Sequence, residues 1–232
     1  MTERIIGILQ EAFSRILVAS IQVTLPLTII GFSLAMVIAM IMALVQYAKI
    51  PVLTQIARLY IWIFRGTPLL VQLFLAYFGL PKLGIVMDAF PCAVMVFALN
   101  EGAYCSETMR SALESVSEGQ IEAGYCAGMN YLQIMWHVVL PQAFRTAFPP
   151  LSNSLISMLK DTSLAATITV ADMFMAAQRV VGRTYEPLWV YIEVALVYLF
   201  FSTLLTILQR AGEKRLGFFT SKEVNTKKEV RA

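Results

Sequence analysis

The stretch ILVASIQVTLPLTIIGFSLAMVIAMIMALVQYA, residues 16–48, decides the class of this protein because it contains no charged side chain. An α-helix needs ~20 mainly apolar residues to cross the hydrocarbon core of a bilayer, and this run is longer. The rest of the chain agrees with it. Of its 232 residues, 58% are hydrophobic and 14% are charged, against ~45–50% and ~25% in soluble domains. The sequence therefore predicts an all-α membrane protein.

Four further apolar segments follow the first one along the chain. We expect five membrane spans in all, over residues 16–48, 59–80, 89–109, 147–171 and 187–209. An odd number of spans places the two ends of the chain on opposite sides of the membrane. Basic residues concentrate in cytoplasmic segments, and the tail from Arg210 onward is rich in them. We therefore expect the N-terminus outside and the C-terminus inside, with residues 1–212 as the membrane domain and residues 213–232 as a polar cytoplasmic tail.

Composition also argues against several kinds of function. The net charge of +3 gives no indication of nucleic-acid binding, and the three cysteines have neither the spacing of a zinc site nor that of a disulfide framework. No Gly-rich phosphate-binding motif occurs, so we expect no nucleotide and no other cofactor in this chain. A membrane-embedded enzyme is the distant alternative, because one histidine and scattered carboxylates supply no nucleophile–base pair.

The longest polar connection, residues 111–145, lies between the third and fourth expected spans. It carries an apolar stripe at helical spacing: Ile121, Tyr125, Met129 and Leu132. Gly128 and Asn130 are expected to end a first short helix, and Pro141 to end or kink a second one. Two short amphipathic helices at the membrane surface would offer a docking knob to a soluble partner.

Within this connection, EAGYCAGMNYLQIMWHVVLP (residues 122–141) resembles the EAA loop of ABC importer permeases. The positions that match the motif in register are Glu122, Ala123, Gly128, Val138, Leu140 and Pro141. Gly124 departs from the pattern, because it replaces the second alanine and weakens the helix locally. The resemblance implies that six loop residues couple the membrane domain to an ATPase: Glu122, Ala123, Gly128, Met129, Leu140 and Pro141.

Other stretches resemble the polar amino-acid branch of these permeases: IFRGTPLLVQLF from residue 63, GAYCSETMRSAL from 102, LPQAFRTAFPPLSNS from 140 and LKDTSLAAT from 159. The resemblance covers about residues 17–210. It implies the five-helix, MetI-like fold of a type I importer, embedded in the lipid of a bacterial inner membrane. The implied partners are two ATPase subunits that use ATP and Mg, an extracytoplasmic solute-binding protein, and a second permease copy or a sister permease. The implied mechanism is ATP-driven alternating access.

The adjacent charges Lys160 and Asp161 fall inside the fourth expected span. A charge at the bilayer centre costs ~2.5–3.5 kcal/mol even on the lenient scale, and such residues usually mark a substrate route. Ser154 and Ser157 share the face of Asp161 on a helix, whereas Lys160 points about 100° away. This face would suit a zwitterionic ligand, with the carboxylate pairing with an α-ammonium group. Lys160 is also counted as a candidate contact; the alternative for both charges is structural pairing within the bundle.

Other polar residues in the expected spans are candidates either for substrate contacts or for pairing between helices. Glu101 is either a second cavity carboxylate or the partner of Lys160, and the sequence leaves this open. Gln72 is counted among the candidate substrate contacts. Arg65 and Glu107 lie at similar depth on neighbouring spans and are expected to form an ion pair, structural or gating.

The identity of residue 154 bears on the substrate. In permeases of this branch for basic amino acids this position is typically glutamate, so Ser154 argues against a dedicated arginine or lysine carrier. The pattern LSNS…SMLKDTSLAATI most resembles the cystine-type permeases. The resemblance therefore implies import of a polar amino acid, with L-cystine as the finer expectation and glutamine or an amino-acid derivative as the alternative.

Overall fold

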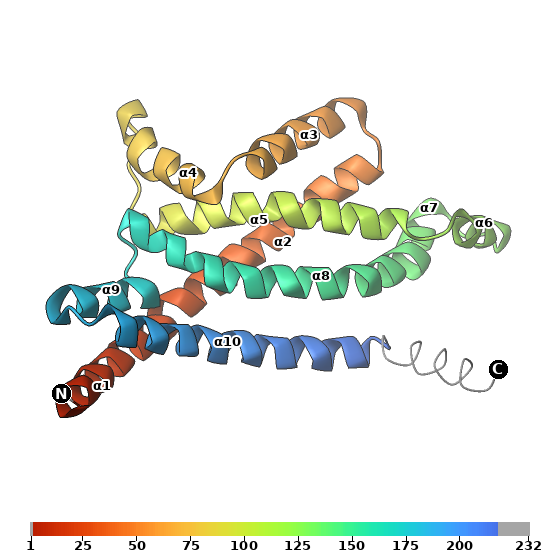
Figure 1. Cartoon of the computed structure of the whole chain (residues 1–232). Helices are drawn as coiled ribbons and strands as arrows, with labels where there is room; N and C mark the ends of the chain where they lie inside the picture. The colour runs from red at the N-terminus through yellow and green to blue at the C-terminus, as the bar shows by residue number, and fades with distance from the viewer. Residues whose placement is uncertain (1, 218–232) are drawn as a thin grey trace, which may run out of the picture.

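The protein is described by a computed structural model that covers residues 2–217, and within these residues it consists of helices and connections with no strand. Figure 1 shows long helices running side by side. Two short helical segments, α6 and α7 (residues 118–134), project at one end and are called the knob below. The all-α fold predicted from the sequence is confirmed.

The first long helix begins earlier than the expected span. α1 (Thr2–Ala19), a π-helical turn η1 (Ser20–Thr24) and α2 (Leu25–Tyr47) continue one another. The π-turn ends two residues before Pro26, which has no backbone N–H to donate, so a local change of the hydrogen-bond pattern lets the helix continue.

α2 lies along α5 (Ala89–Glu114), and the two helices form the most extensive contact of the bundle. The face of α2 toward this contact carries buried small residues every fourth position: Gly31, Ala35, Ala39 and Ala43. Small residues at this spacing allow helix backbones to approach closely within a membrane. This packing fixes the rotation of α5 and therefore the direction of its polar face.

The second expected span is two helices instead of one. α3 (Pro51–Gly66) is followed, after a break at Thr67 and Pro68, by α4 (Leu69–Phe74) with the short turns η2 (Leu75–Gly79) and η3 (Leu80–Leu83). The helical segments on either side of the break meet at 103°. Both break residues have extended backbone, because proline disfavours helical conformation in the residue before it. The expected span over residues 59–80 therefore contains a sharp bend, and whether the bent pair crosses the membrane as one span stays a prediction.

The knob and the next long helix form one unit. α6 (Glu118–Cys126) precedes α7 (Tyr131–Ile134), and a π-turn η4 (Met135–Val139) joins α7 to α8 (Leu140–Asp161). The helix neither ends nor breaks at Pro141, contrary to expectation. Pro141 lies in the first turn of α8, directly after the π-turn, where a missing N–H is tolerated.

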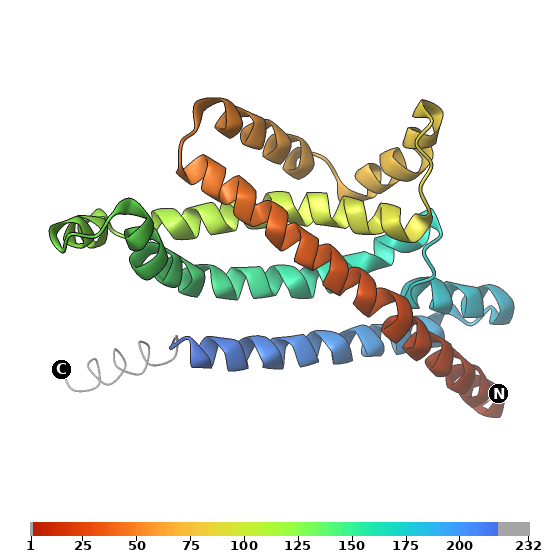
Figure 2. The same cartoon turned by 180° about the vertical axis from the view of Figure 1, so that it is seen from behind.

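The last elements return along the bundle. A 3₁₀ segment η5 (Thr162–Ile168) ends α8, and α9 (Met173–Thr184) and α10 (Pro187–Arg215) follow. α1, α9 and α10 pack around a shared apolar core. Figure 2 shows that α1 begins at one end of the bundle, whereas α10 ends at the other, near the knob.

Length and composition alone identify two helices that could cross a membrane, Glu3–Tyr47 and Pro187–Arg215. Two bent pairs raise the number to four if each pair is one span. α5 is not among them, and it carries polar residues such as Asn100 and Glu101 in its middle. Five spans and the orientation of the termini stay predictions.

Candidate functional site

A cavity of ≈ 360 Å³ lies where the α3–α4 break faces α5 and α8. Its lining residues are Thr67, Pro68, Leu69, Asn100, Glu101, Tyr104, Ser154, Ser157, Asp161 and Leu164. Four of the residues singled out as substrate contacts from the sequence therefore lie in one cavity. They come from two helices that are far apart in the chain.

α8 presents its three predicted side chains on one face, as its periodicity requires. Asp161 is the last residue of α8 and is half-buried, with the Ser157 hydroxyl 3.5 Å from its Oδ2. Ser154 lies farther toward the knob on the same face. The result is a carboxylate followed by two hydroxyls along the cavity wall.

α5 supplies a second carboxylate. Glu101 is half-buried in the cavity, where the Ser154 hydroxyl is its neighbour and the Cys105 thiol donates to its Oε1 at 3.4 Å. Glu101 thus occupies the space beside residue 154.

Lys160 is exposed on the other side of α8. It lines a different groove with Phe174, Tyr191 and Tyr198. None of the ion pairs within the described part of the chain joins Lys160 to Glu101. The pairing of these two residues, one of the two alternatives from the sequence, is not what the structure contains.

Gln72 supports the cavity wall from behind and is not among the lining residues. Its Nε2 donates to the carbonyl oxygen of Phe64 at 2.9 Å, and to the carbonyl oxygen and Oγ1 of Thr67 at 3.1 and 2.8 Å. Its Oε1 accepts from Asn100 Nδ2 at 3.0 Å. Gln72 therefore ties α3, α4 and α5 together at the break. Asn100 was missed from the sequence, although a buried amide within an apolar segment is itself a sign of such a role.

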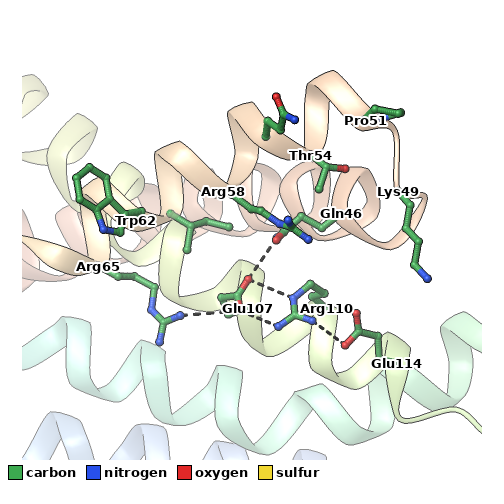
Figure 3. A pocket seen from close by; sticks show the side chains of 12 residues that line it. Gln46, Lys49, Pro51, Thr54, Arg58, Trp62, Arg65, Glu107, Arg110 and Glu114 are labelled. Carbon is green, nitrogen blue, oxygen red and sulfur yellow. Dashed lines mark hydrogen bonds and ion pairs between the residues drawn. The ribbon is translucent and has the colours of Figure 1, made fainter.

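The predicted ion pair of Arg65 with Glu107 is present but long, at 3.9 Å (Figure 3). Glu107 pairs more closely with Arg110 at 2.8 Å and accepts from Gln46 Nε2 at 3.3 Å. The guanidinium of Arg65 also lies over the ring of Tyr104, 5.3 Å from its centroid. Arg65 is thus the most weakly held member of this cluster.

Polar space continues from the cavity toward the knob end of the bundle. A second cavity of ≈ 600 Å³ shares Tyr104 and Ser154 with the first and is also lined by Arg65 and Glu107. Arg65 and Glu107 in turn border an open pocket of ≈ 700 Å³ between α2, α3 and α5 (Figure 3). The ion pair therefore lies between the second cavity and the open pocket.

Of the two short helices that the sequence predicted for the knob, α6 is a separate short helix, whereas the second begins at Tyr131 and continues into α8. Glu122 and Ala123 are exposed on α6, and Gly128 turns the chain with φ +79°, a conformation that favours glycine. Asn130 begins the next helix through a capping box with Gln133.

Gly124, the departure from the motif, is buried where α6 meets α7. A Cβ atom at this position would lie 2.8 Å from Ile134 Cγ1. The large Ile134 side chain thus fills the space that a small residue leaves.

The predicted apolar stripe of the loop is divided in the structure. Ile121 and Met129 pack against the core, whereas Tyr125 and Leu132 point outward. The turn at Gly128 separates the stripe into two helices, so one period no longer applies to all four residues. With Trp136, 69% exposed, and Leu132, 68% exposed, the knob presents an apolar outer surface. Leu140 packs on the core and Pro141 is exposed at the start of α8.

Comparison with known proteins agrees with this architecture. A family model described as "Binding-protein-dependent transport system inner membrane component" matches residues 35–218. The L-cystine transport system permease protein TcyB of Bacillus subtilis is 44% identical over 216 residues, which cover 93% of this chain and 92% of that protein.

Two solved structures share the fold. An amino acid ABC transporter crystallised with histidines superposes with a TM-score of 0.78 at 34% identity, covering 83% of this chain and 90% of that one. An inward-facing MetNI methionine ABC transporter has a TM-score of 0.72 at 17% identity, covering 93% and 99%. The chain belongs to the family of binding-protein-dependent transport system inner membrane components, the non-enzymatic permease subunits of ABC importers in the bacterial inner membrane.

Proposed function

We propose that this chain is the permease subunit through which an ATP-driven importer moves a polar amino acid, and that the cavity between the α3–α4 break, α5 and α8 holds the substrate. The observation that carries the proposal is that Asp161, Ser154, Ser157 and Glu101 line one cavity. A carboxylate can pair with the α-ammonium group of an amino acid, and hydroxyls can donate to its carboxylate.

The knob provides the connection to ATP hydrolysis in this proposal. The helix that begins at Tyr131 in the knob continues to Ile168, and Asp161 lies thirty positions along it, about 45 Å at 1.5 Å per residue. A displacement of the knob by an ATPase would therefore reach the cavity through one continuous helix. This supports alternating access, with the knob and the C-terminus inside and the N-terminus outside.

The partners follow from this role. We propose two ATPase subunits docked on the knobs, a second permease copy or a sister permease, and an extracytoplasmic solute-binding protein. The finer proposal for the substrate is L-cystine, supported by the sequence pattern around residues 151–168 and by the similarity to TcyB. Glutamine or an amino-acid derivative is the alternative.

Uptake of labelled amino acids by proteoliposomes containing the complete importer tests the function. We expect ATP-dependent accumulation of L-cystine above that of glutamine. Asp161→Asn removes a charge-assisted hydrogen bond worth ~1.5–3 kcal/mol, so it should weaken the apparent affinity for every substrate about ten- to a hundredfold. Asp88→Asn, an exposed aspartate before α5, is the matched control. Accumulation of no amino acid contradicts the function, and unchanged transport by Asp161→Asn contradicts the site.

A further inference from the structure

The charge of the cavity is unbalanced. Glu101 and Asp161 line it, and no lysine or arginine is among its described lining residues. Lys160 opens onto the groove beside Tyr198, and Arg65 borders the neighbouring spaces next to Glu107. Two carboxylates within a bundle of low dielectric repel each other unless positive charge lies between them. A ligand with ammonium groups can supply positive charge inside this cavity.

The two carboxylates are separated along the cavity. Glu101 lies beside Ser154, and Ser154 precedes Asp161 by seven residues, roughly 10 Å along α8. Both side chains line the same cavity. A molecule with an ammonium group at each end can pair one group with each carboxylate.

Glu101 and Asp161 also differ in how they are held. Asp161 has Ser157 as its neighbour on α8, and Glu101 has Cys105 on its own helix and Ser154 across the cavity. Neither carboxylate is neutralised by an ion pair within the described residues. Both therefore keep acceptor oxygens for a ligand, in contrast to Glu107, which is occupied by Arg110.

We propose that Glu101 is a specificity-determining residue that selects an amino acid with two ammonium groups. Asp161 binds one ammonium group and Glu101 the other. This inference rests on the proposed function and names the substrate class for the same cavity. Two kinds of ligand carry two ammonium groups: a bis-amino acid such as L-cystine, and a diamino acid such as L-lysine.

Two matched ligand pairs test the proposal. L-cystine is compared with S-methyl-L-cysteine, and L-lysine with L-norleucine, because each second compound keeps one α-ammonium group and lacks the other cation. Dissociation constants are measured by radioligand binding to the purified permease–ATPase complex in lipid nanodiscs without the binding protein. We expect the wild-type complex to prefer the two-ammonium member of at least one pair about ten- to a hundredfold, the contribution of one charge-assisted hydrogen bond. The ligand pair that shows the preference identifies whether the substrate is a bis-amino acid or a diamino acid.

Glu101→Gln should remove this preference, because it weakens binding of the two-ammonium compounds far more than binding of the one-ammonium compounds. Glu114→Gln, a carboxylate on the same helix but outside the cavity, should keep the preference. Equal binding of both members of each pair by the wild type overturns the inference alone. So does a preference that survives Glu101→Gln, or a Glu101→Gln variant that weakens all four ligands equally. Binding of none of the four ligands by the wild type overturns the proposed cavity itself.

Discussion

Replacing Gln72 with methionine tests whether this side chain supports the cavity wall or contacts the substrate. Methionine has a similar length but cannot make the four hydrogen bonds of the amide. Two of the former partners stay satisfied, since the Phe64 carbonyl still accepts from Asn100 at 3.2 Å and Thr67 Oγ1 still donates to Ile63 at 2.8 Å. The Thr67 carbonyl loses its hydrogen bond and Asn100 loses one acceptor.

These losses set the expected magnitude. Thr67 is exposed, so the hydrogen bond lost by its carbonyl counts at the ordinary ~0.5–1.5 kcal/mol, and an interhelical hydrogen bond in a membrane protein contributes ~0.6 kcal/mol on average. Gln72→Met should therefore lower the free energy of unfolding by about 1–2 kcal/mol. Apparent substrate affinity should fall only through loosening of the break at Thr67 and Pro68.

The assay is unfolding of the purified protein by SDS titration in mixed micelles. Gln55→Met is the matched control, because Gln55 is an exposed glutamine on α3 whose side chain makes no hydrogen bond within residues 2–217. We expect it to change the free energy of unfolding by less than ~0.5 kcal/mol. If Gln72→Met is no more destabilising than Gln55→Met, but substrate binding is lost, the amide contacts substrate and the structural role is refuted.

Three further predictions concern the knob and the orientation. Glu122→Lys reverses an exposed charge on α6, so we expect ATP-driven uptake to be lost while the permease stays inserted; full uptake would contradict docking at this helix. Gly124→Ala puts a Cβ 2.8 Å from Ile134 Cγ1. We expect this clash to outweigh the gain of ~1 kcal/mol in helix propensity and to weaken coupling, which Ile134→Ala should restore because it removes Cγ1. A coupling rate unchanged by Gly124→Ala would show that the contact adapts freely. In a variant without native cysteines, a cysteine in place of Gly84 should be labelled from outside and one in place of Gln120 only from inside; the reverse result overturns the orientation.

Periodicity determined the part of the site that lies on one helix. Asp161, Ser154 and Ser157 share a face because 3.6 residues complete a turn, whatever surrounds the helix. Lys160 points elsewhere for the same reason. The end of the first loop helix was equally predictable, because the turn at Gly128 depends on neighbouring residues in the chain. Asn130, expected to end that helix, instead caps the start of the next one.

Tertiary structure decided which side chains from other helices reach the cavity. The sequence placed Gln72 with the substrate contacts, but the bend of 103° after α3 turns its amide onto Thr67 and Asn100. From the sequence, Ser154 argued against a basic ligand because it replaces a carboxylate. In the structure, α5 supplies the carboxylate of Glu101 beside Ser154. The rotation of α5 depends on its close contact with the small residues of α2, and the spacing of residues within α5 contains no information about that contact. A single helix fixes the angles among its own side chains, and only packing between helices fixes what those side chains face.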